Sequence, residues 1–238
     1  MKNLLVAFIA FISVSVSAQT NIKGNGNVIK ETREVSNFSR VSLAGNVNVQ
    51  LSFGNSPTIT VEGDENVLPY IETVIENETL IVRTKNKTGI NSKNKLIVYA
   101  SMTKIEELKV SGSGNITGNG EFTNNEKTSL SVSGSGNITV GIASFNETKI
   151  AISGSGNVTL KGESTNNIDA TISGSGNIDC SGVSCNNVFA KVSGSGNIRV
   201  YANRSIDAKV SGSGNIYYKG AATNINLKSA GSGKIIKA

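Results

Sequence analysis

The pentapeptide Ser-Gly-Ser-Gly-Asn occurs six times between residues 111 and 215, at intervals of about twenty residues. An altered copy, Ala-Gly-Ser-Gly-Lys, occupies residues 230–234. A repeat of fixed period indicates that one structural unit is stacked many times and that neighbouring units share a core. No other feature of the sequence restricts the possible folds as strongly.

Apolar and polar residues alternate between the copies of the pentapeptide. Each Asn is followed by Ile or Val, and the segments that lead into the next copy alternate in the same way, as at Ile168, Ala170 and Ile172. A period of two is typical of strands with one buried face. Abundant glycines and β-branched residues disfavour helices. The sequence predicts an all-β fold in which coils of about twenty residues form a parallel β-solenoid over residues 109–238.

Stacked coils lie about 4.8 Å apart, so identical residues in successive coils should lie over one another. We expect the pentapeptide glycines to adopt backbone angles that other residues resist, at one corner of each coil. A repeated ligand site is disfavoured, because no Lys-Ser/Thr follows the glycines and the motif contains no acid. We also predict a structural ladder of side-chain amides, formed by Asn115, Asn137, Asn157, Asn177, Asn197 and Asn215.

Residues 19–108 lack the pentapeptide but still show alternation, for example through Val47, Val49 and Leu51. We interpret them as a strand-rich N-terminal half that is continuous with the solenoid, with a soft boundary near residue 108, because no Pro-rich or Ser-rich linker separates the two. Residues 86–94 are expected to form an exposed, mobile loop.

Residues 1–18 have the three regions of a signal peptide. Lys2 precedes an apolar run from Leu4 to about Ile12, and small residues follow up to Ala18. The run is shorter than the roughly 20 apolar residues that a membrane-spanning helix needs. We therefore predict a mature chain that begins near Gln19, has no transmembrane segment, and is periplasmic, surface-located or secreted.

Composition excludes several classes of function. The chain has no His, so a Ser-His-Asp triad, a Cys-His pair and the common zinc sites are absent. The net charge is +6, but the basic residues are scattered and are not interleaved with the five Tyr and seven Phe, so nucleic acid is not expected as a partner. We expect no catalytic residues, no cofactor and no metal.

Aspartates leave one enzymatic alternative open. Asp169 and Asp207 are expected in one outward-facing column, two coils and therefore about 10 Å apart, with Asp179 on another strand. Glycoside hydrolysis uses paired carboxyl groups about 5–9.5 Å apart. A solvated face is the favoured interpretation, and a polysaccharide-acting enzyme on a β-helix is the alternative.

Two smaller groups of residues also have alternative interpretations. Glu62, Asp64 and Glu65 form either a weak Ca²⁺ site or, as we favour, a polar turn between strands. Cys180 and Cys185 lie in one coil, where a disulfide and two free thiols are both compatible with the spacing.

The sequence resembles the head GIN domain proteins, a family of exported proteins found mainly in Bacteroidetes and also described as "putative auto-transporter adhesins". The resemblance rests on the segment "NFSRVSLAGNVNVQLSFGNSPTITVEGDENVLPYI", the later "ETLIV" and the train of "GSGNI" turns, and it covers about residues 30–238. It implies a right-handed parallel β-helix-like fold outside the cytoplasm and no known catalytic residues.

Our hypothesis from the sequence is an exported, non-enzymatic β-solenoid that serves as an adhesin-like module or a binding or structural module of the cell envelope. Its expected partners are a glycan, a component of the cell envelope or another protein.

Overall fold

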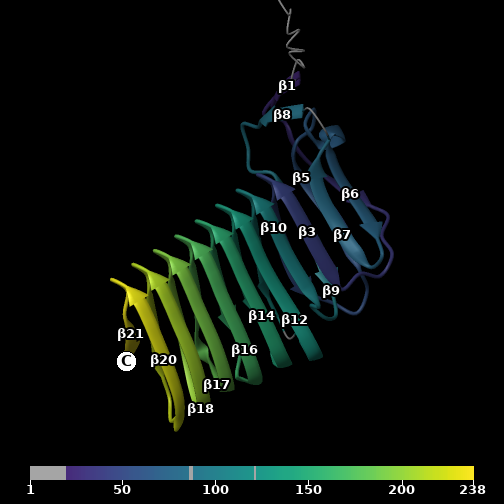
Figure 1. Ribbon diagram of the computed structural model, residues 1–238. Helices are drawn as coiled ribbons and strands as arrows, with labels where there is room; N and C mark the ends of the chain where they lie inside the picture. The colour runs from purple at the N-terminus through teal and green to yellow at the C-terminus, as the bar shows by residue number, and fades with distance from the viewer. Residues whose placement is uncertain (1–19, 86–87, 121) are drawn as a thin grey trace, which may run out of the picture.

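Two stacks of parallel strands form most of the molecule (Figure 1). The computed structural model describes residues 20–85, 88–120 and 122–238, so the predicted signal peptide at residues 1–18 lies outside the described residues. In each coil a longer strand ends at the first glycine of the pentapeptide, and a shorter strand begins at its Asn. Within the described part of the chain, no helix is long and apolar enough to cross a membrane.

We call the first stack the long-strand sheet. It consists of β3 (Arg40–Gly45), β10 (Glu107–Gly112), β12 (Thr123–Gly134), β14 (Ser144–Gly154), β16 (Ser164–Gly174), the second halves of β17 (Asn177–Gly194) and β18 (Asn197–Gly212), and β20 (Asn224–Gly231).

We call the second stack the short-strand sheet. It consists of β4 (Asn48–Phe53), β11 (Asn115–Asn119), β13 (Asn137–Gly141), β15 (Asn157–Lys161), the first parts of β17 and β18, β19 (Asn215–Lys219) and β21 (Ile235–Lys237).

Equivalent residues of successive coils are paired in register. Val158 of β15, for example, lies opposite Ile138 on one side and Ile178 on the other, and none of the three has measurable exposure to solvent. Such aliphatic columns fill the space between the two sheets, and each coil shares its buried surface with its neighbours. The predicted β-solenoid of stacked coils is confirmed.

The pentapeptide forms the corner between the sheets, and only the first of its two glycines has an unusual backbone angle. Gly154 has φ +129°, a backbone conformation that favours glycine. Gly156 is needed for close approach, because a Cβ at this position would lie 2.0 Å from the carbonyl oxygen of Gly136 in the preceding coil. The expectation that both glycines supply unusual backbone angles therefore holds for the first glycine only. Close packing of the corners requires both, because a Cβ at Gly154 would also lie 2.4 Å from the carbonyl oxygen of Gly134.

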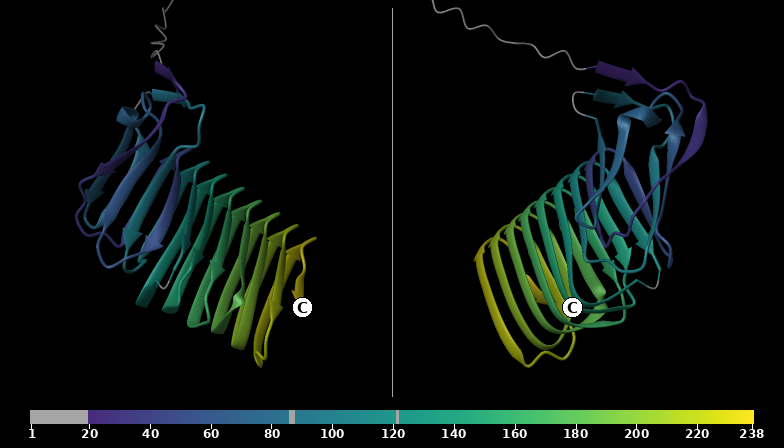
Figure 2. Two further views of the ribbon diagram at one scale, coloured as in Figure 1. Left: turned by 180° about the vertical axis from the view of Figure 1, so that it is seen from behind. Right: turned by 90° about the vertical axis from the view of Figure 1, so that its right-hand side faces the viewer.

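The N-terminal segment covers the first coil of the solenoid. This coil, β3–β4, stacks on β10–β11, and on its other side β3 pairs with β7 and β4 pairs with β9. The predicted boundary near residue 108 falls inside β10, and the strand-rich N-terminal half is continuous with the solenoid as expected (Figure 2). The remaining elements of this cap are β2 (Val28–Arg33), β5 (Thr58–Asp64), the 3₁₀ helix η1 (Leu68–Tyr70), β6 (Ile71–Glu76), β7 (Thr79–Thr84) and β9 (Ile97–Met102).

Antiparallel pairs distinguish the cap from the coils. β5 lies antiparallel between β2 and β9, and β6 forms an antiparallel hairpin with β7. The hairpin turns at Asn77 and Glu78, which both have positive φ. Because these strands run differently from the solenoid strands, the cap ends the parallel stack at this side.

The expectation of a mobile loop at residues 86–94 is wrong for residues 88–94, while residues 86–87 lie outside the described part. β8 (Thr88–Asn91) pairs with β1 (Thr20–Lys23) in a separate two-stranded parallel sheet. The residues that follow β8 donate hydrogen bonds to the carboxylate of Asp64. These contacts hold a polar segment that has no apolar pattern of its own.

Candidate functional site

The structure joins the six predicted ladder asparagines by hydrogen bonds between their side chains. From Asn137 to Asn215, each Nδ2 donates to the Oδ1 of the ladder Asn in the coil before it, over 2.7–3.1 Å. The ladder begins one coil earlier than the pentapeptide, because Asn115 donates to Asn48 over 2.8 Å. At the other end, the backbone N–H of Lys234 donates to Oδ1 of Asn215. The ladder atoms are occupied by neighbouring coils, so we assign the motif a structural role.

A second set of ladders lies at another bend of the coils. Asn186 donates to Asn166, and Asn166 donates to Asn146. Beside them, Asn187 donates to Asn167 over 3.1 Å. Sequence reasoning missed these ladders, although recurring Asn-Asn pairs at residues 166–167 and 186–187 were a signal for them.

Cys180 and Cys185 are two buried free thiols rather than a disulfide. Both side chains have no measurable exposure, and Cys180 occupies the inward column that holds Leu160 and Val200 in adjacent coils. Burial raises the pKa of the Cys180 thiol well above its usual range and raises the pKa of Cys185 to about 11. Neither thiol is therefore arranged as a nucleophile or a metal ligand.

The aspartates of the solenoid are not adjacent to one another. Asp169 and Asp207 lie in one column of the long-strand sheet, and Phe189 occupies the position between them. Asp207 forms an ion pair with Lys209, while Asp179 on the short-strand sheet accepts hydrogen bonds from Ser181. Two coils separate Asp169 from Asp207, about 10 Å, which is the upper limit of the spacing used by glycosidases, and the side chain of Phe189 stands between them.

The acidic cluster of the cap has a structural role. Asp64 is buried and accepts hydrogen bonds from Ser92 Oγ at 2.6 Å and Asn94 Nδ2 at 2.6 Å, which hold its pKa at about 2. Glu62 pairs with Lys30, and Glu65 accepts from an Asn side chain. Among the described residues, no group of three His, Cys, Asp or Glu side chains is placed to hold a metal ion.

A cavity of about 330 Å³ lies where residues 37–39, 54–57 and 102–104 meet. Its cation, Lys104, forms an ion pair with Glu106, which also binds Arg40 over 2.8 Å. Because the cation in its lining is paired within the protein and the other charged lining residue is the carboxylate of Glu78, the cavity is a weaker candidate for a ligand site than the surface described next.

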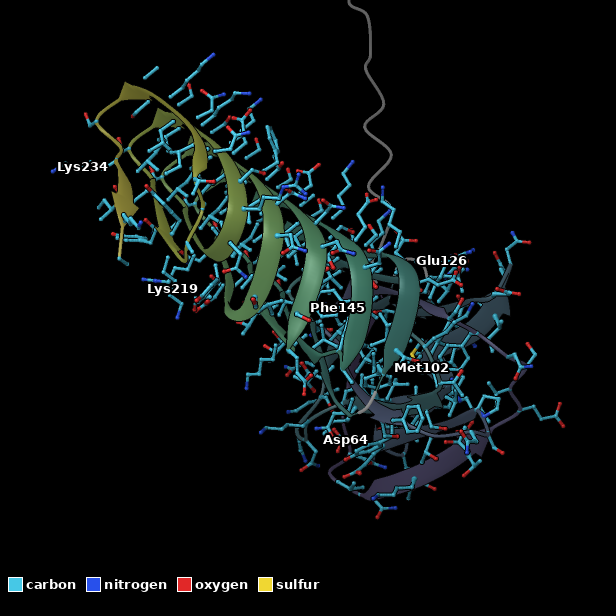
Figure 3. The ribbon with its side chains drawn as sticks, turned by 90° about the horizontal axis from the view of Figure 1, so that it is seen from below. Asp64, Met102, Glu126, Phe145, Lys219 and Lys234 are labelled. Carbon is cyan, nitrogen blue, oxygen red and sulfur yellow. The ribbon has the colours of Figure 1, made fainter. Side chains whose placement is uncertain are left out.

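Aromatic and basic side chains gather on the short-strand sheet of the last coils. We define the aromatic surface as Arg199 and Tyr201 of β18 together with Tyr217 and Lys219 of β19. Arg199 lies opposite Tyr217, and Tyr201 lies opposite Lys219. The two tyrosines are half-buried and the two basic residues are exposed. Lys219 projects outward from these coils, far from Asp64 in the cap (Figure 3).

Each basic group of the aromatic surface lies over a ring in the adjacent coil. The guanidinium carbon of Arg199 is 5.3 Å from the ring centre of Tyr217, and Nζ of Lys219 is 5.5 Å from that of Tyr201. These distances are within the range of cation–π attraction. A hollow of about 210 Å³ borders the surface and is lined by Arg199, Tyr217, Lys219 and neighbouring residues.

Earlier coils present much smaller side chains in the same column. The positions equivalent to Tyr217 are Thr117, Thr139 and Thr159, followed by Asp179 and Arg199. Sequence reasoning missed the aromatic surface, since Arg199 and Tyr217 are adjacent only after the coils are placed in register. The change from Thr to Arg and Tyr in one repeat column was the available signal.

Comparison with protein families gives a match over residues 37–222, to a family described as "Putative auto-transporter adhesin, head GIN domain". No curated protein matches the sequence.

Several solved structures share the fold. A protein from Bacteroides fragilis titled "putative adhesin" has a TM-score of 0.82 and 22% identity, covering 91% of this chain and 100% of its own. A "putative lipid binding protein" from Parabacteroides distasonis has a TM-score of 0.73 and 23% identity, covering 92% and 100%. A "putative adhesin" from Parabacteroides merdae has a TM-score of 0.69 and 26% identity, covering 92% and 99%.

Proposed function

This chain belongs to the head GIN domain family, and from that premise we propose that it is an exported, non-enzymatic binding module that attaches to glycans of the cell envelope. The observation that carries the proposal is the aromatic surface, Arg199, Tyr201, Tyr217 and Lys219, on the outer face of the last coils. The similar structures titled as adhesins are consistent with it.

The chemistry of the aromatic surface suits a sugar. Tyrosine combines a flat apolar ring, on which the C–H face of a sugar packs, with a hydroxyl group that exchanges hydrogen bonds. Arg199 and Lys219, which lie over the two rings, add hydrogen-bond donors to the same surface. The rings lie on strands whose partners fix them on both sides, so little conformational freedom is lost on binding.

The absence of an enzymatic role is part of the proposal. Asp169 and Asp207 are separated by Phe189, and Asp207 is paired with Lys209. The polysaccharide-acting alternative needs an acid and a base or nucleophile on either side of one bond. Incubation of residues 19–238 with a panel of polysaccharides should release no reducing ends and no unsaturated products. Turnover that is lost in Asp207→Asn would instead support the enzyme.

Export is also proposed rather than observed, on the strength of the sequence of residues 1–18. Expression of the full chain in a bacterium, followed by fractionation and N-terminal sequencing, should give a product outside the cytoplasm that begins near Gln19. A full-length cytoplasmic product would contradict this part of the proposal.

The test of binding is a glycan array probed with residues 19–238, followed by calorimetry with the glycans that bind. We expect Tyr201→Ala/Tyr217→Ala to weaken binding at least about tenfold, as removal of central aromatic contacts commonly does. The matched control is Thr139→Ala/Thr159→Ala, in the same outward column as Tyr217. Absence of binding, or equal binding by both double variants, would contradict the proposed site.

A further inference from the structure

Three lysines lie over one another on the outer face of the long-strand sheet. Lys191 is in register with Lys209, and Lys209 is in register with Lys228. We call these three residues the lysine column. In the preceding coils the same column holds small residues, Ser131, Ala151 and Thr171. Lys109 occupies the same column at the other end of the sheet, so only the three coils next to the C-terminus place lysines on adjacent strands.

Stacking like charges on adjacent strands is unfavourable, because the strands that carry the three ammonium groups are only about 4.8 Å apart. Lys209 is partly compensated by Asp207, at 3.4 Å, and by the ring of Phe189, at 5.1 Å. Within the described residues, neither Lys191 nor Lys228 lies within salt-bridge distance of a carboxylate. In the described residues, Lys191 and Lys228 are therefore cations without a carboxylate partner, and the partly compensated Lys209 lies between them.

The lysine column borders a hollow whose exposed lining is mostly apolar and includes Val192 and Val210. The hollow has a volume of about 280 Å³, and its lining also includes the three lysines, Ser211, Ser229 and Ala230. Ser211 lies in register with Ser193 and Ser173, and this column of serines is next to the lysine column. The ammonium groups and the outward hydroxyl group of Ser211 therefore lie beside the hollow, and such donors suit carboxylate or sulfate oxygens.

We propose that the lysine column binds a linear acidic polysaccharide that lies across the coils, parallel to the long axis of the solenoid. Such a polymer carries anionic groups at regular intervals along its chain. The lysines also recur at a regular interval, about 4.8 Å across the sheet, so several anionic groups can meet several lysines. The proposal deepens the function proposed above by naming a charged class of glycan, but it uses the long-strand sheet, whereas the aromatic surface is on the short-strand sheet.

An anionic membrane fits this surface less well. Binding to a membrane surface combines cations with apolar side chains that enter the lipid on the same face. Beside the lysine column the outward residues are Ser193, Ser211 and Ala230 on one side and Phe189, Asp207 and Asn226 on the other. Phe189 is the one large apolar side chain among them, and it is half-buried with Nζ of Lys209 over its ring. The exposed Ile225 and Leu227 belong to the inward columns of the last coil and not to this face.

The experiment measures binding of residues 19–238 to polygalacturonate and to dextran sulfate, with neutral dextran as the uncharged control. We expect binding to both acidic polymers at low salt, no binding to dextran, and weakening as salt screens the charges. Lys191→Gln/Lys228→Gln should weaken binding roughly fivefold to tenfold and flatten its salt dependence. Lys209 is kept because it is paired with Asp207.

Lys109→Gln/Lys149→Gln is the matched control, because it removes the same charge from exposed positions of the same sheet that have no lysine on an adjacent strand. Lys149 lies in the column beside the lysines, and Lys109 is separated from Lys191 by Ser131, Ala151 and Thr171. This control should leave binding within about twofold, since isolated exposed charges contribute little. Circular dichroism of both double variants should match that of the unaltered protein, because all four side chains face outward.

Several results would overturn the proposal. Equal weakening by the two double variants would mean nonspecific attraction to a basic protein. Tighter binding to phosphatidylglycerol vesicles or to duplex DNA than to the acidic polysaccharides would assign the column to another partner. Failure to bind either acidic polymer would contradict the proposal that the lysine column is a binding site. Tyr201→Ala/Tyr217→Ala should leave this binding unchanged, so failure of the aromatic surface and failure of the lysine column are distinguishable.

Discussion

Oδ1 of Asn137 accepts two hydrogen bonds from Asn157 in the next coil, one from the side-chain Nδ2 at 2.8 Å and one from the backbone N–H at 3.1 Å. Asn157 in turn accepts from Nδ2 of Asn177 at 2.9 Å. The side chain of Asn157 therefore connects three coils, and the side chain of Asn137 also satisfies a backbone donor at the start of a strand. This geometry accounts for the recurrence of Asn at the last position of the pentapeptide.

Asn157→Ala should lower the free energy of unfolding by about 1 kcal/mol, the usual net contribution of a lost hydrogen-bonded group. The substitution removes the bonds to Asn137 and Asn177 but leaves the strand and its buried neighbours unchanged. Denaturant unfolding followed by circular dichroism provides the measurement. Thr159→Ala, two residues further along the same strand on the outward face, is the control and should cost clearly less. Equal costs for the two variants would argue against the ladder.

Stability should depend on the ionisation of Asp64. Hydrogen bonds from Ser92 and then Asn94 hold the pKa of Asp64 at about 2, below the usual value of 3.8. Because the folded protein favours the ionised form, this contribution is complete above about pH 4 and is lost as the pH falls towards 2. Thermal unfolding between pH 2 and pH 6 should show a steeper loss of stability in the unaltered protein than in Asp64→Asn. Parallel pH profiles for the two proteins would contradict this assignment.

The two thiols should be inert in the folded protein. Cys180 and Cys185 are fully buried, and burial raises the pKa of both, to about 11 for Cys185. At pH 8 a thiol reagent such as iodoacetamide should label neither residue until denaturant is added, when it should label both. Intact mass should not change on reduction. A mass that rises on reduction would show a disulfide that the structure does not contain.

The solenoid was predictable from sequence because its columns repeat. Ile138, Val158 and Ile178 recur at equal spacing, so alignment of the pentapeptides also aligns the core, and the positions of the ladder asparagines follow from the same alignment. The role of Gly156 did not follow, because a preference for unusual φ and a close contact with another coil both select glycine.

The cap was predictable only as a set of strands. β5, β6 and β7 each occur once, so no repeat reveals their partners or their antiparallel pairing. β8 shows no alternation and contains few apolar residues. It and the residues after it are held by contacts with β1 and Asp64, which are distant in sequence.

The surfaces of the last coils illustrate a further limit. Lys191, Lys209 and Lys228 look scattered along the sequence, as do Arg199 and Tyr217, because register rather than proximity in the chain brings them together. The coil between the pentapeptides at 193 and 211 has eighteen residues instead of twenty. A fixed period of twenty therefore does not align these lysines, or Arg199 with Tyr217.

The central claim is that the repeated pentapeptide is a structural corner whose second glycine permits adjacent coils to touch. The most direct test is the free energy of unfolding of Gly156→Ala compared with Gly182→Ala. A Cβ at Gly156 would lie 2.0 Å from the carbonyl oxygen of Gly136, whereas a Cβ at Gly182 meets nothing within 4 Å. We predict a loss of about 1–3 kcal/mol for Gly156→Ala and a change within about 0.5 kcal/mol for Gly182→Ala. Equal stability of the two variants would contradict the stacked-corner account.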